Sequence, residues 1–198
     1  MPISAMRLQA AAVFLSSWCL ACPASAQNSP PPDPSKLVEI GGFDVKGSRI
    51  PADSIIRLSG LKAGQQANYS IIDAACHRIT STGLVKMIDY AYETFPGKSG
   101  VVLSLTLTDE LPLFPAKVVP PEDADKIWGC LQAADPIFTR ELPNTRAALN
   151  FYSANINRCI EIHGQHDAYV HASVACDVHG NASEIIFDIR PKEPVASK

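Results

Sequence analysis

A change of hydrophobic periodicity at Gly83 limits the possible folds of this chain more than any other feature of its sequence. The apolar residues before this glycine recur at the spacing of one helix face: Ile71, Ile72, Ala75, Cys76 and Ile79. Ser70 and Asp73 resemble a capping box, so we expect this helix to begin there. Gly83 is the residue type that ends helices in a left-handed conformation. After it, apolar residues such as Ile88 and Tyr90 stand at every second position, which predicts a strand.

The residues before and after this segment complete a small unit that contains both helices and strands. Residues 38–45 are typical of a strand, and residues 51–59 of a short helix. Pro96-Gly97 predicts a turn, and residues 101–108 then alternate between apolar and polar, as a second long strand would. The predicted order is strand, helix, helix, strand, strand.

Short segments of this unit match the pattern of one family in the same order. They are Val45-Lys46-Gly47 at the end of the first strand, Ile50, Ile55 and Leu58 in the first helix, the link Leu61-Lys62-Ala63-Gly64, and Thr82-Gly83-Leu84-Val85 followed by Ile88 and Tyr90. Residues 37–110 therefore resemble a POTRA (polypeptide-transport-associated) domain. Such domains precede outer-membrane β-barrels that insert or secrete proteins.

The second half of the chain repeats this organisation in a divergent form. Aligning Gly164 with Gly83 places Ile160 where Ile79 stands, and a period-two run follows each glycine. The repeat lacks a Val-x-Gly after its first strand, and Gln165-His166-Asp167 replaces the expected apolar entry. We interpret residues 111–192 as a second POTRA-like domain. The predicted fold class is α+β, with two tandem β-α-α-β-β modules, each a three-stranded sheet covered by two helices.

The two ends of the chain have the composition of processed or extended segments. Residues 1–26 are expected to be a signal peptide, with Arg7 before an apolar run and Ala24-Ser25-Ala26 as the cleavage site. A lipidated Cys22 is the alternative, although Cys19 occupies a position where lipoprotein signals have an aliphatic residue. Residues 27–36 form a Pro-rich tether and residues 193–198 a tail. We expect a periplasmic protein with no membrane-spanning segment in its mature chain, and association with the outer membrane is the alternative location.

Composition and motifs indicate neither a nucleic-acid-binding protein nor an enzyme. The formal net charge is -3, and no basic patch is present in the sequence. The sequence contains no Gly-x-Ser-x-Gly segment and no glycine-rich phosphate loop after a strand. We therefore expect no catalytic activity and no cofactor. A hydrolase without a familiar motif and a scaffold without clients are the remaining alternatives to a binding protein.

Four cysteines remain after the predicted cleavage: Cys76, Cys130, Cys159 and Cys176. An exported chain can oxidise such residues. If the two helices of the second module are antiparallel, Cys130 is level with the start of the second helix. The rises of about 1.5 Å per helical residue and about 3.3 Å per strand residue bring Cys176 to the same level. We therefore predict a Cys130–Cys176 disulfide and an unpaired Cys159.

Histidines gather in the second half and offer an alternative function. They are His163, His166, His171 and His179. A metal site needs several such ligands to converge with supporting partners. An exported ligand-binding or metal-binding protein that uses this half is therefore the alternative reading of the sequence.

The POTRA resemblance implies a protein-binding function. In that family the sheet order is one, three, two, so the second strand, residues 86–94 here, lies at an edge. Such an edge accepts an extended polypeptide as an added strand. The candidate binding residues are Lys86, Ile88, Asp89, Tyr90, Tyr92 and Glu93. The partners are unfolded client proteins or an outer-membrane β-barrel machine, and the chain is expected to act as a stand-alone protein without its own barrel.

Overall fold

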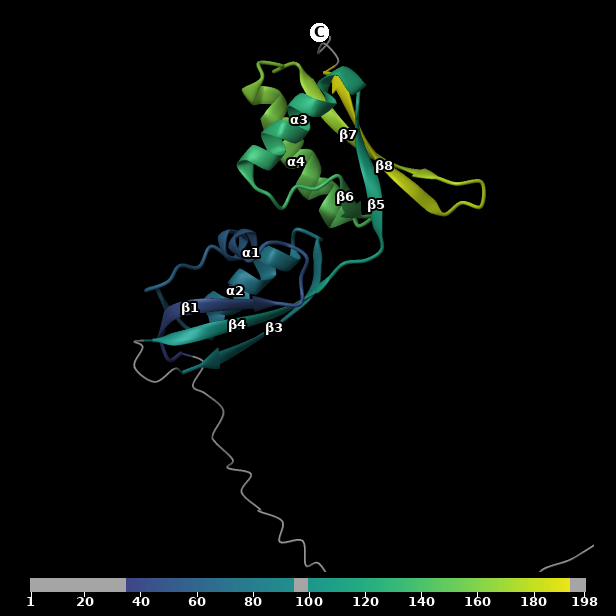
Figure 1. The fold of residues 1–198 in the computed structure, drawn as a ribbon. Helices are drawn as coiled ribbons and strands as arrows, with labels where there is room; N and C mark the ends of the chain where they lie inside the picture. The colour runs from purple at the N-terminus through teal and green to yellow at the C-terminus, as the bar shows by residue number, and fades with distance from the viewer. Residues whose placement is uncertain (1–34, 95–99, 193–198) are drawn as a thin grey trace, which may run out of the picture. The chain divides into compact units, whose positions relative to one another are not determined.

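The computed structural model describes residues 35–94 and 100–192 (Figure 1). The predicted signal peptide, most of the tether, the Pro96-Gly97 turn and the C-terminal tail lie outside these residues. The described residues all belong to one compact unit. Within the described residues, no helix is long and apolar enough to cross a membrane.

The first module contains two helices and one sheet, in the order that the sequence predicted. Its elements are β1 (Val38–Lys46), α1 (Ala52–Ser59), β2 (Gln66–Ala67), α2 (Tyr69–Thr80), β3 (Val85–Glu93) and β4 (Val101–Asp109). The strand order is β2-β1-β4-β3. Strand β4 pairs in parallel with β1 and antiparallel with β3. The order of the three long strands is confirmed, and the short strand β2 extends the sheet beyond β1.

The second module repeats this topology. Its elements are β5 (Leu113–Val119), α3 (Pro121–Ala134), β6 (Glu141–Pro143), α4 (Arg146–Ile162), β7 (Ala168–Cys176) and β8 (Ala182–Pro191). The strand order is β6-β5-β8-β7, again with a parallel central pair and an antiparallel hairpin. The α+β class with two repeated modules is confirmed. Each sheet has four strands instead of three, because the chain between the helices adds a short strand.

The helices of the first module cover one face of its sheet, with α1 over β1 and α2 over β3 (Figure 1). Helix α2 buries Ile72 and Ile79 completely, and β4 buries Leu103 against them. The helix begins earlier than predicted. Its N-cap is Asn68, whose side chain accepts a hydrogen bond from the Ile71 amide, so Ser70 lies inside the first turn.

Aromatic residues fill the core of the second module. Tyr152 of α4 is fully buried and stacks on Phe187 of β8, with ring centroids 6.0 Å apart. Trp128 of α3 packs edge-on to the same tyrosine at 6.5 Å. The Tyr152 hydroxyl accepts a hydrogen bond from the Thr139 amide at 3.1 Å, which satisfies its polar end inside the core.

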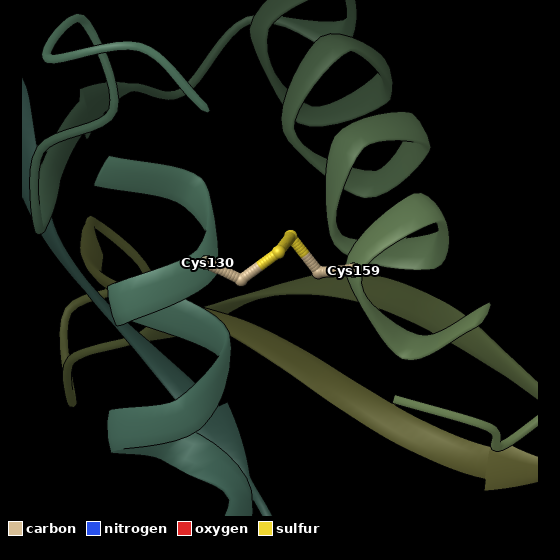
Figure 2. The surroundings of a disulfide bond; sticks show 2 residues. All are labelled: Cys130 and Cys159. Carbon is tan, nitrogen blue, oxygen red and sulfur yellow. A yellow bond between two sulfur atoms is a disulfide. The ribbon is translucent and has the colours of Figure 1, made fainter. Parts of the chain in front are cut away.

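The disulfide of the second module joins Cys130 of α3 to Cys159 of α4, so the predicted Cys130–Cys176 pairing is wrong (Figure 2). The Cα atoms of the bonded pair are 6.0 Å apart. The prediction assumed that α4 begins level with Cys130. In the structure, the connection between the helices first forms β6 on β5, and the helices then meet near Cys159. Cys176 lies exposed at the end of β7 and is free, as is the half-buried Cys76.

Side chains of the two modules also contact each other. The Asp135 carboxylate accepts hydrogen bonds from Ser54 Oγ at 2.6 Å and Arg57 Nε at 3.1 Å. Burial acts to raise the pKa of Asp135, but the hydrogen bonds from Arg57 and Ser54 outweigh it and hold that pKa below its ordinary value. At a second contact, Thr145 Oγ1 donates to the Gly83 carbonyl at 3.3 Å. Ser54 and Arg57 of α1, and Gly83 after α2, therefore contact the second module at the end of α3 and the start of α4.

Candidate protein-binding edge

Strand β3 is the edge of the first sheet and carries all the candidate binding residues. It pairs with β4 from Val85 to Glu93, and no described residue pairs with its other side. A strand in this position presents backbone N–H and C=O groups that another extended chain can pair with. The structure therefore gives β3 the edge position on which the binding hypothesis depends.

The two faces of β3 differ in chemistry. Ile88 and Tyr90 point to the side of the sheet that α2 covers, and both pack against the core. Asp89 and Glu93 are exposed on the opposite side, where no helix covers the sheet. Lys86 is exposed as well. The edge thus combines charged positions, which discourage unspecific pairing of identical edges, with an apolar side next to the helix.

Three tyrosines form a cluster on the helix side of this edge. Tyr90 lies with its ring centroid 6.2 Å from that of Tyr69 on α2 and 6.0 Å from that of Tyr92. Tyr69 and Tyr92 remain 54% and 38% exposed, so large aromatic surface is open to solvent beside the strand. Aromatic side chains of this kind bind partners with little loss of conformational freedom.

The hydroxyl of Tyr90 is buried but makes no hydrogen bond to any described residue. Burial, together with the neighbouring Tyr69 and Tyr92, raises the pKa of Tyr90 to about 12. A buried hydroxyl without a partner is unfavourable, since it has lost its hydrogen bonds to water. The Tyr90 hydroxyl is therefore an unfavourable feature of the packing between α2 and β3 among the described residues.

Changing Tyr90 and Tyr152 to phenylalanine should have opposite effects on stability. Tyr90→Phe removes an unsatisfied hydroxyl and should raise the free energy of unfolding by up to about 1 kcal/mol. Tyr152→Phe leaves the Thr139 amide without its acceptor and should lower it by about 1–3 kcal/mol. Urea unfolding of both variants checks this. A loss of stability in Tyr90→Phe equal to that in Tyr152→Phe would mean that the Tyr90 hydroxyl has a partner in solution.

A hollow of about 230 Å³ lies between α2 and β3 beside the cluster. Its lining residues are Asp73, Cys76, His77, Thr80 and Ile88. Burial and the nearby Asp73 carboxylate raise the pKa of the Cys76 thiol, so it remains protonated and unreactive at neutral pH. Asp73, Cys76, His77 and Thr80 stand at the spacing of one helix face, which the sequence alone shows. The sequence does not show that this face of α2 lies beside β3.

The histidines of the second module do not gather into a ligand set. His171 lies on the exposed side of β7, and His179 lies in the β7–β8 turn, where its amide donates to Asp177. Throughout residues 35–94 and 100–192, no three His, Cys, Asp or Glu side chains come together as a metal ion would require. The structure therefore offers no observation that favours the metal-binding alternative.

Solved structures similar to this chain include POTRA domains of Omp85 and BamA. POTRA1-3 of Omp85 from Anabaena is 14% identical, with a TM-score of 0.39, over 78% of this chain and 61% of that one. The N-terminal domain of Omp85 from Thermosynechococcus elongatus is 15% identical, with a TM-score of 0.39, over 78% and 63%. POTRA3-5 of BamA from Haemophilus influenzae is 11% identical, with a TM-score of 0.37, over 78% and 66%. The chain thus spans less than two thirds of each of these structures.

No protein-family model matches the chain, and no curated protein sequence matches it.

Proposed function

We propose that this chain is a periplasmic protein-binding protein that receives extended polypeptide as an added strand along β3. The observation that carries the proposal is the edge position of β3, next to an exposed tyrosine cluster and a hollow under α2. Backbone pairing depends little on the sequence of the client, because every residue type except proline offers both an N–H and a C=O group.

The chemistry of the edge defines the polypeptide that fits it. An added strand places alternate side chains on the two sides of the sheet. On the α2 side, apolar or aromatic client residues would contact Tyr92 and the hollow. On the other side, client residues would lie near Asp89 and Glu93, where polar or basic groups are favoured. Alternating apolar and polar residues are typical of strands of outer-membrane barrels.

The proposed partners follow from this chemistry. They are unfolded outer-membrane proteins or the barrel machine that assembles them, and the chain supplies no catalytic step. A single added strand buries little surface, so each contact should be weak and transient. That property suits a protein that must release its clients.

Photo-crosslinking tests the proposed edge. A photoreactive amino acid at Lys86, Asp89 or Glu93 should capture an unfolded barrel-strand polypeptide about fivefold more than one at Asp53. Asp53 is a matched control, since it is an exposed aspartate on α1, and α1 covers β1 instead of β3. Asp73 is unsuitable as a control because it lines the hollow beside the edge.

Hydrogen exchange distinguishes backbone pairing from other contacts. Added client should slow exchange of the outward-facing β3 amides and leave those of β2, at the opposite edge, unchanged. Equal capture at Asp53 and Asp89, or unchanged exchange along β3 when client is bound, would show that strand addition at this edge is not the mechanism.

A further inference from the structure

The two modules have the same order of elements, so the ends of the helices in the first module have counterparts in the second. Pro51 and Pro120 are the N-caps of α1 and α3. Three residues later stand Ser54 and Asp123, and after a further three residues Arg57 and Lys126. Gly83 and Gly164 follow α2 and α4, with positive φ angles of 71° and 81°. These pairs allow the surfaces of the modules to be compared residue by residue.

In the first module these positions form an occupied docking face. Ser54 and Arg57 bind Asp135, which caps the end of α3. The Cβ position of Gly83 would lie 2.7 Å from both Ala147 Cβ and Thr145 Oγ1, so the first turn of α4 fills the space in front of this glycine. The loop after α3 and the N-terminus of α4 therefore occupy this docking face.

In the second module the counterpart positions are open. A Cβ atom built on Gly164 meets nothing within 4 Å. A hollow of about 390 Å³ lies here, and Pro120, Asp123, Gly164 and Gln165 are among its lining residues. Asp123 is 18% exposed and lies 3.9 Å from Lys126, as Ser54 lies close to Arg57 in the first module. The surface that the first module uses to receive its neighbour is therefore present in the second, and none of residues 35–94 and 100–192 covers it.

The first module also has a counterpart of the segment that fills the docking face, namely the loop after α1 and the start of α2. The loop after α1 is the counterpart of the loop after α3, and its residues Gly60, Lys62 and Gly64 are exposed. Asn68 caps α2 through the Ile71 amide, as Thr145 caps α4 through the Ala148 amide. The loop after α1 and the start of α2 thus resemble the loop after α3 and the start of α4, which fill the docking face of the first module.

Charge on the two surfaces is complementary, with the signs exchanged. Within the chain, the receiving helix supplies the base Arg57 and the entering loop supplies the acid Asp135. Between copies, the receiving helix would supply the acid Asp123, and the entering loop would supply the base Lys62, which lies two residues beyond Gly60, the counterpart of Asp135 at the end of its helix.

We propose that the hollow at Asp123, Gly164 and Gln165 docks the α1–α2 end of a second copy of this chain. The contact is head-to-tail, so it adds copies in a row or closes into a ring. Its surfaces are largely polar, and the dissociation constant should be on the order of 10⁻⁴ M. The charged residues of this contact, Asp123 and Lys62, lie outside β3, but Tyr69 at the start of α2 belongs to the tyrosine cluster beside that strand.

Sedimentation and charge exchange test this contact. The weight-average mass should rise with protein concentration. Asp123→Lys or Lys62→Asp should each weaken the association about fivefold, and the double variant should restore it. Lys62 lies in an exposed loop, so Lys62→Asp tests the contact even if Asp123→Lys disturbs the start of α3.

Crosslinking locates the contact. A photoreactive amino acid at Gln165 should link to residues 60–70 of another copy, and one at the exposed His179 in the β7–β8 turn should not. A monomer up to about 1 mM would overturn the proposal. So would self-association that neither charge variant alters, or crosslinks from Gln165 that reach only other parts of the chain or only a different protein.

Discussion

Replacing Gly83 with alanine should lower the free energy of unfolding by about 3 kcal/mol or more. The first reason is the positive φ angle of 71°, a conformation that costs an L-residue about 1–2 kcal/mol. The second is steric, because the new methyl group would overlap the backbone nitrogen of Ala148 and lie 2.7 Å from Ala147 Cβ. Overpacking of this kind costs about 1–3 kcal/mol, and a helix backbone cannot move aside as a side chain can.

Gly164→Ala is the matched control for this substitution. Gly164 has a φ angle of 81°, but a Cβ atom there meets nothing within 4 Å. Only the conformational cost of about 1–2 kcal/mol should remain. Urea unfolding at low protein concentration measures both variants. Equal losses of stability would mean that the first turn of α4 does not pack on Gly83 in solution.

Removing the Cys130–Cys159 disulfide should lower the free energy of unfolding by about 3–4 kcal/mol. The bond closes a loop with a sequence separation of 29, and the chain-entropy estimate for such a loop has this size. Cys159 is also only 3% exposed, so its replacement leaves a small defect in the core. The double variant Cys130→Ala/Cys159→Ala, measured by urea unfolding, gives the total effect.

The free cysteine Cys176 provides a control within the same chain. Cys176→Ser changes an exposed residue and should shift stability by less than about 0.5 kcal/mol. A reducing agent should destabilise the wild-type protein nearly as much as the double substitution does, and should leave the double variant unchanged. A wild-type protein indifferent to reduction would show that the bond does not form in solution.

Periodicity predicted the long elements well and the short ones not at all. The switch at Gly83 and the alternation in residues 101–108 follow from burying one side of a helix or strand, so they are visible in the sequence. Strands β2 and β6 contain two and three residues, too few for any period to appear. They form because the connection between the two helices of each module runs beside the first strand of the sheet and pairs with it.

The disulfide and the helix start show how tertiary packing overrides local reasoning. The misplaced disulfide came from assuming that α4 starts where α3 ends, although β6 intervenes between them. Both Asn68 and Ser70 are suitable N-caps, and the structure selects Asn68 because α2 begins immediately after β2. The edge position of β3 followed from the resemblance, but the unsatisfied Tyr90 hydroxyl and the hollow beside it depend on side-chain packing that no sequence pattern encodes.

The parallel pairing of the first and last strand in each module has a mechanical consequence. Strand β1 lies in parallel beside β4, and β5 lies in parallel beside β8. Tension applied to the two ends of a module pulls such neighbours along their length in opposite directions. Their hydrogen bonds are then loaded together, in shear, and must fail as a group instead of opening one after another. Each module should therefore resist stretching along the chain, while the edge strands β3 and β7 lie outside the parallel pair that carries the load.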